Sequence, residues 1–68
     1  MLDTRGLSCP MPVVMVQQEL DGQEELTVLA DNRTAVENIT RFAASKRYTV
    51  SVAEQDGEYT LTLRRNAE

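Results

Sequence analysis

The chain has 68 residues, a length that allows one domain with a thin stability margin. Hydrophobic residues make up 41% of it, but the aromatic ones are only Phe42, Tyr48 and Tyr59, so we expect an aliphatic core. There is one cysteine, Cys9, and no histidine. These two counts exclude an internal disulfide, zinc-finger-type metal sites and catalytic pairs that use histidine.

The formal net charge is −4, from 11 acidic and 7 basic residues, and an acidic domain disfavours direct contact with nucleic acid. The first five residues do not resemble a secretory signal, and the longest apolar run, Val13–Val16, is too short to span a bilayer. We therefore expect a single domain over residues 1–68 that is cytoplasmic and monomeric. It should carry a reduced thiol, bind no metal or cofactor, and have no membrane contact.

In the first part of the chain the alternation over residues 1–5 predicts a short strand, and Gly6 permits a turn after it. Pro10 suits the first position of a helix, where a backbone N–H is not needed, so Cys9 should be the last residue before that helix. Asp21-Gly22 should end the helix, because glycine accepts the left-handed conformation of a C-cap. The apolar positions expected to face the core are Val13, Val16 and Leu20.

Alternating residues over 26–30 predict a second strand, and a second helix follows it. Two starts remain open for that helix, because Asp31-Asn32 can cap it and Thr34–Glu37 fits a capping box. The apolar stripe of this helix consists of Val36, Ile39, Phe42 and Ala43.

Two further alternating runs, residues 48–53 and 59–64, are separated by Asp56-Gly57, which is a strong signal for a β-hairpin. The polar tail from Arg64 onward is expected to fray. The order is β-α-β-α-β-β, and each hairpin strand has only one apolar face. We therefore expect a two-layer α/β sandwich with a mixed four-stranded sheet and both helices on one face. Strands joined through a helix should be parallel and paired.

Cys9 is the candidate for chemistry. The free N–H groups at a helix start, with the positive end of the helix dipole, lower the pKa of a thiol and favour the nucleophilic thiolate. Pro10 and Pro12 would stiffen that helix start, while Arg5 and the Gly6 backbone are near in sequence. The alternative is that Cys9 is a buried small hydrophobe, since free cysteine is among the most buried residue types.

The segment Leu2-Asp3-x-Arg5-Gly6-Leu7-x-Cys9-Pro10-x-Pro12-Val13 resembles the signature of the TusA/SirA/YedF family of small sulfur-carrier proteins. The centre of that signature is the Cys-Pro-x-Pro motif, and the resemblance covers essentially the whole chain. It implies a two-layer α/β sandwich with the same element order. The stretch over residues 28–43 resembles the YedF-type branch, which is linked to selenium metabolism.

The resemblance further implies a sulfur relay of the sulfurtransferase type. Cys9 would accept sulfane sulfur from a cysteine desulfurase or a rhodanese-like donor and pass it to an acceptor protein, in tRNA thiolation or in sulfur or selenium metabolism. Pro10 and Pro12 would shape the helix start, and Arg5 and Gly6 would support the loop.

Two departures from the family pattern put in question which partner protein this chain binds. The first helix, over residues 13–20, carries no basic residue, and Lys46-Arg47-Tyr48 stands where many members have a glycine. The alternative hypothesis is therefore a non-catalytic regulatory or protein-binding module of the same fold. A third hypothesis is a redox-sensing thiol, which would need a thiol from another molecule because this chain has only Cys9.

Overall fold

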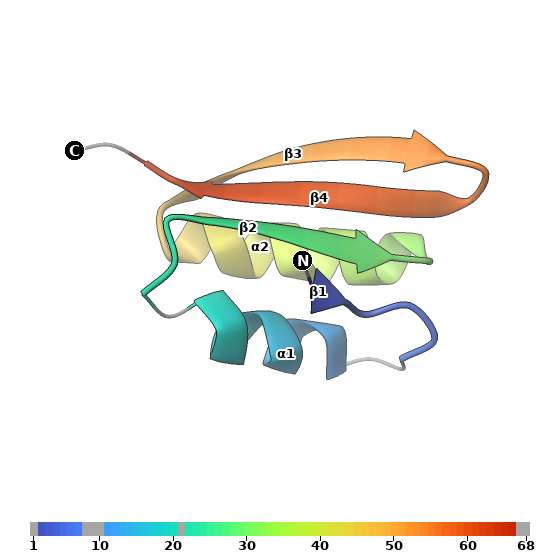
Figure 1. Ribbon diagram of the computed structural model, residues 1–68, viewed down its shortest axis with the longest axis horizontal. Coiled ribbons are helices and arrows are strands. Elements are labelled where there is room, and N and C mark those ends of the chain that lie inside the picture. The colour runs from blue at the N-terminus through green and yellow to red at the C-terminus, as the bar shows by residue number, and fades with distance from the viewer. Residues whose placement is uncertain (1, 8–10, 21, 67–68) are drawn as a thin grey trace.

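The fold comes from a computed structural model, which describes residues 2–7, 11–20 and 22–66. The described residues form four strands and two helices in the predicted order β-α-β-α-β-β, and their arrangement can be followed in Figure 1. The bounds are β1 (Leu2–Asp3), α1 (Met11–Leu20), β2 (Glu25–Ala30), α2 (Arg33–Ser45), β3 (Tyr48–Gln55) and β4 (Glu58–Arg65).

The strands form one mixed sheet in the order β1-β2-β4-β3. β1 pairs with β2 in parallel, whereas β4 is antiparallel to both of its neighbours. Both helices cover the same face of this sheet, so the predicted two-layer sandwich is confirmed (Figure 1). One detail was wrong: β2 and β3 run in the same direction but do not pair. The tight hairpin turns β4 back into the space between them.

The ends of the two helices follow from local capping. Asn32 is the N-cap of α2, and its side-chain oxygen accepts the N–H of Ala35 at 2.7 Å. This decides between the two predicted helix starts in favour of Asp31-Asn32. After α1, Gly22 has φ +81°, as expected of a left-handed residue at a helix end. The expected start of α1 at Pro10, directly after Cys9, lies outside the described residues.

The hairpin between β3 and β4 turns on Asp56 and Gly57, whose φ angles of 54° and 81° are both positive. Such a pair makes a type I′ turn, which matches the twist of the flanking strands. β4 continues to Arg65, and the N–H of Asn66 donates to the carbonyl of Arg47 at 3.0 Å. The prediction that the chain frays from Arg64 onward is therefore wrong for residues 64–66, because the backbone hydrogen bonds beside β3 extend to Asn66.

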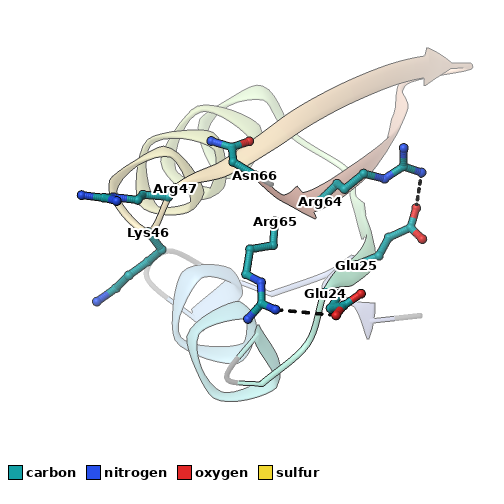
Figure 2. Close-up of a pocket in the computed structure, with 7 residues that line it drawn as sticks. All are labelled: Glu24, Glu25, Lys46, Arg47, Arg64, Arg65 and Asn66. Atoms are coloured by element: carbon teal, nitrogen blue, oxygen red, sulfur yellow. Dashed lines mark hydrogen bonds and ion pairs between the residues drawn. The ribbon is translucent and has the colours of Figure 1, made fainter. Parts of the chain in front are cut away.

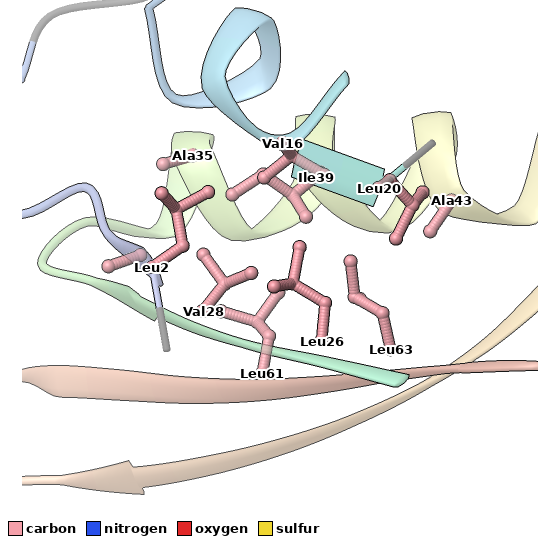
Figure 3. Packing of buried hydrophobic residues seen from close by; sticks show 11 residues of the cluster. Leu2, Val16, Leu20, Leu26, Val28, Ala35, Ile39, Ala43, Leu61 and Leu63 are labelled. Carbon is pink, nitrogen blue, oxygen red and sulfur yellow. The ribbon is translucent and has the colours of Figure 1, made fainter. Parts of the chain in front are cut away.

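The core lies between the helices and the sheet and is aliphatic, as predicted from the scarcity of aromatic residues (Figure 3). Its most deeply buried hydrophobic members, each with no exposed surface, are Val16, Val28, Ala30, Ile39, Ala43, Leu61 and Leu63. Phe42, Tyr48 and Tyr59 are partly buried and pack against its margin. Neither described helix is long and apolar enough to cross a membrane.

Candidate functional site

The loop that leaves β1 begins with a tight turn over residues 4–7. Thr4 is buried and donates both its backbone N–H and its hydroxyl to the carbonyl of Leu29 in β2. The N–H of Leu7 then donates to the carbonyl of Thr4 at 3.3 Å, which closes the turn. Gly6 sits at the third position with φ +81°, the conformation that a type II turn requires there. The direction of the chain after β1 is therefore set by Thr4 and Gly6.

A side chain from a distant part of the sequence holds this turn. The N–H of Gly6 donates to Oδ2 of Asp31, just beyond the end of β2, at 2.8 Å. The other oxygen of Asp31 accepts from the Asn32 side chain at 3.1 Å. The Gly6 N–H, followed by the Asn32 amide, lowers the pKa of Asp31, so its carboxylate is ionised at neutral pH. The loop after β1 is thus fixed to the junction between β2 and α2.

Arg5 makes a second set of polar contacts at this loop. Its Nε and Nη2 each donate to the Asp3 carboxylate at 2.9 Å, and its backbone N–H donates there at 3.0 Å. Its Nη1 lies 3.3 Å from both carboxylate oxygens of Glu58, at the start of β4. The Arg5 side chain is the largest cause that lowers the pKa of Asp3 to about 2, and Asp3 in turn raises the pKa of Arg5. Arg5 therefore joins the end of β1 to the hairpin.

The sequence-predicted site residues are only partly within the described chain. Arg5 and Gly6 lie on the turn, and Pro12 is buried in the first turn of α1. Cys9 and Pro10 lie outside the described residues. They follow Leu7, which is half-buried, and precede Met11, the first residue of α1, whose side chain is 46% exposed. The assignment of Cys9 as the reactive residue stays a prediction.

Sequence reasoning missed Asp31 and Glu58 as supports of this loop. From the sequence, Asp31 was assigned only a role in capping the second helix. Nothing else in the pattern around Asp31 indicated a contact with the loop after β1. Their contacts with Gly6 and Arg5 span 25 and 53 residues of sequence, so only the folded sheet brings them together. Asp3, which the sequence showed only as a position of the motif, is the main partner of Arg5.

A charged hollow lies away from this loop, where α2 and β4 end and β2 begins (Figure 2). Two ion pairs form between residues that line it: Arg64 with Glu25 at 3.0 Å and Arg65 with Glu24 at 3.6 Å. The residues lining it are Glu24, Glu25, Lys46, Arg47, Arg64, Arg65 and Asn66. None of them belongs to the turn over residues 4–7 or to the start of α1, so this hollow is separate from the candidate site.

The exposed side of α1 differs from the hollow in its charge. Gln17, Gln18 and Glu19 are exposed there, and the helix has no basic residue over its whole described length. A partner that docks on α1 would therefore meet amide and acidic groups rather than cations.

Comparison with known proteins decides the family. A family model described as "Sulfurtransferase TusA" matches residues 1–65. The chain belongs to the TusA sulfurtransferase family. This confirms the resemblance drawn from the motif at residues 2–13, and it makes the chain a member of a sulfur-carrier family. The match does not separate the branches of the family, so the YedF-type assignment stays a prediction.

Two relatives agree with this membership. The chain is 46% identical over 57 residues to a protein of Methanocaldococcus jannaschii named "putative sulfur carrier protein", which covers 79% of this chain and 76% of that protein. A crystal structure of a SirA-like protein from Desulfitobacterium hafniense matches with a TM-score of 0.85 at 28% identity. That match covers 97% of this chain and 96% of the other. The predicted fold class is confirmed by this structural similarity.

Proposed function

We propose that this protein is a sulfur carrier that holds one sulfane sulfur as a persulfide on Cys9. The observation that carries the proposal is the match of residues 1–65 to the TusA sulfurtransferase family, in a chain whose only cysteine is Cys9. With no second cysteine, the chain cannot resolve a persulfide into an internal disulfide. A carrier benefits from this, because the sulfur is kept until an acceptor arrives.

In the loading step the Cys9 thiolate attacks the terminal sulfur of a persulfide on the donor. A new S–S bond forms on Cys9, the S–S bond of the donor breaks, and the donor cysteine leaves as a thiolate. In the unloading step a thiolate of the acceptor attacks the terminal sulfur of the Cys9 persulfide, and Cys9 leaves as a thiolate. The sulfane sulfur moves without net oxidation or reduction, so neither step needs a cofactor.

The donor in this proposal is a cysteine desulfurase or a rhodanese-like protein, and the acceptor is a second protein. The pathway is tRNA thiolation or another branch of sulfur or selenium metabolism. With a net charge of −4 the chain is unsuited to bind tRNA by itself, so sulfur would reach RNA only through the acceptor.

The described contacts support this function by positioning the chain on both sides of the reactive segment. The Asp31 carboxylate fixes Gly6, and the pair formed by Arg5 and Asp3 stiffens the end of β1. On the other side, Pro12 is buried in the first turn of α1. The described residues before and after Cys9 are therefore fixed in place, and such positioning favours attack in a defined direction.

The test is the intact mass of the protein after incubation with a cysteine desulfurase and cysteine. We expect a gain of about 32 Da, one sulfur, in the native chain and no gain in Cys9→Ser. The added mass should disappear with a reductant such as dithiothreitol, as a persulfide does. A native chain that gains no sulfur from desulfurase or from inorganic polysulfide would refute the proposal.

A second candidate function is a protein-binding module that no longer transfers sulfur, and the base-free surface of α1 favours it. It predicts that Cys9→Ala keeps the cellular function, while Gln17→Ala or Gln18→Ala weakens binding of a partner. Loss of function in Cys9→Ala, in a variant that remains folded, would reject this alternative and support the carrier.

A further inference from the structure

The outer strand β3 is an edge that lacks the usual protection against pairing. It runs for eight residues, Tyr48–Gln55, and every one of them is in register with β4, so it has no bulge. It contains no proline and no lysine, and Glu54 is its only charged residue. The opposite edge, β1, is two residues long. Natural sheets use short strands, bulges, lysine or proline to blunt an edge, and β3 has none of these.

The free hydrogen-bonding groups of β3 belong to its even-numbered residues. Arg47 accepts the N–H of Asn66, and the two-residue turn makes Gln55 and Glu58 a hydrogen-bonded pair. Because bonding alternates along an antiparallel pair, the odd-numbered residues of β3 face β4. The even-numbered ones direct their N–H and C=O outward, on the side where the described sheet has no further strand.

An exposed apolar side chain lies on the same strand. Val52 is 47% exposed although it faces the helix side of the sheet, opposite the buried Leu61. Val50, two residues earlier, is partly buried and packs against the core. If a second β3 pairs in antiparallel with Ser51 opposite itself, each Val52 lies directly across from Val50 of the other copy. This register would cover the apolar surface that a single chain leaves open.

The charges at the two ends of β3 suit the same arrangement. Lys46 and Arg47 precede the strand, whereas Glu54 lies near its end and Asp56 follows it. Antiparallel pairing of two identical strands brings the start of one beside the end of the other. Glu54 then lies opposite Tyr48 of the second copy, the residue that directly follows Lys46 and Arg47, so opposite charges come near each other at both ends of the contact.

We propose that two copies of this chain associate through their β3 edges, in antiparallel and with Ser51 opposite Ser51, to form a continuous eight-stranded sheet. The interaction replaces the sequence-based expectation of a monomer, which took no account of this edge. It leaves the candidate site free, because β1, which leads into the loop with Arg5 and Gly6, is at the other edge of the sheet. The proposal does not depend on sulfur transfer.

Disulfide trapping tests both the contact and its register, in a Cys9→Ser background so that no other thiol is present. Ser51 would form a non-hydrogen-bonded pair with its copy, with Cα atoms about 4.5 Å apart, which a disulfide can bridge. Mild oxidation of Ser51→Cys at about 0.5 mM should therefore give mostly covalent dimer. Ala53→Cys is the control: it lies on the same exposed face, but its copy would be about 13 Å away along the strand.

Dominant crosslinking of Ser51→Cys over Ala53→Cys supports the proposal, whereas equal yields indicate random collision and overturn it.

Sedimentation velocity of the native chain under reducing conditions gives an independent measurement. We expect a dimer to appear as the concentration rises toward about 0.5 mM, and its loss in Val52→Lys but not in Thr60→Lys. Thr60 is exposed on β4, away from the edge. A native chain that stays monomeric throughout refutes the proposal.

Discussion

The carboxylate of Asp31 accepts a hydrogen bond from the backbone N–H of Gly6, with 2.8 Å between Oδ2 and the nitrogen. The two residues are 25 positions apart, and the bond joins the end of β2 to the loop that leads from β1 toward Cys9. Because the acceptor is a carboxylate, the bond is charge-assisted and stronger than one to a neutral group. The consequences for sulfur loading can be tested directly.

Asp31→Ala removes the acceptor for Gly6 and should slow persulfide loading of Cys9 by on the order of tenfold, because the loop loses its fixed position. The measurement is the rate at which the sulfur-loaded mass appears with a desulfurase present. Glu37→Ala is the control, since it also removes an exposed carboxylate but lies on α2, where its ion-pair partner among the described residues is Arg33 at 3.9 Å. Equal rates in the two variants would show that Asp31 does not position the loop.

Gly6→Ala places a side chain where φ is +81°, a conformation that costs an L-residue roughly 1–2 kcal/mol. Gly22→Ala introduces the same strain after α1, where φ is also +81°. Denaturant unfolding should show a similar loss of stability in both variants, because neither added Cβ comes within 4 Å of the described residues beyond its chain neighbours. Only Gly6→Ala should also slow loading of Cys9. If both variants load equally fast, the type II turn has no part in the reaction.

Asp3 should titrate with a pKa of about 2, because Arg5 hydrogen-bonds to its ionised form. A depressed folded-state pKa means that the stability contributed by Asp3 is fully present above pH 3.8 and is lost as the pH falls through about 2. The side-chain carboxyl resonance followed by NMR measures this pKa. Arg5→Gln should return it toward its ordinary value. A normal pKa in the native chain would contradict the Arg5–Asp3 contact.

Asn32→Ala should destabilise the protein by about 1 kcal/mol, since it removes the N-cap that accepts the Ala35 N–H. Thr34→Ala tests the capping box that the sequence also allowed, and it should change stability much less. The free energy of unfolding from urea denaturation measures both. The reverse order of effects would place the start of α2 at Thr34.

The fold was predictable because each element has a strong local signal. The alternation of Val50 and Val52 marked a strand, Asp56-Gly57 marked a hairpin, and Gly22 marked a helix end. The order of strands in the sheet was less accessible: pairing of β2 with β3 was expected, but β4 lies between them. Sheet order is determined by packing between distant segments, and no local pattern in a single sequence reports it.

The candidate site was predicted to a different extent at each residue. The motif with Cys9 at its centre identified the family, and family membership is confirmed. Arg5 and Gly6 were expected to support the loop, but their acceptors Asp3, Asp31 and Glu58 were not identified as partners. Asp31 and Glu58 carry no pattern of their own, and each gains its role only when the sheet brings it to the loop.

The measurement that tests the central claim most directly is the number of sulfane sulfurs on Cys9 through one cycle of loading and unloading. The protein is loaded by a desulfurase, alkylated and mapped by peptide mass spectrometry, before and after addition of a thiol acceptor. We predict one added sulfur, about 32 Da, on the peptide that contains Cys9, and its complete loss to the acceptor. Sulfur that never appears on this peptide, or that no acceptor removes, would contradict the account.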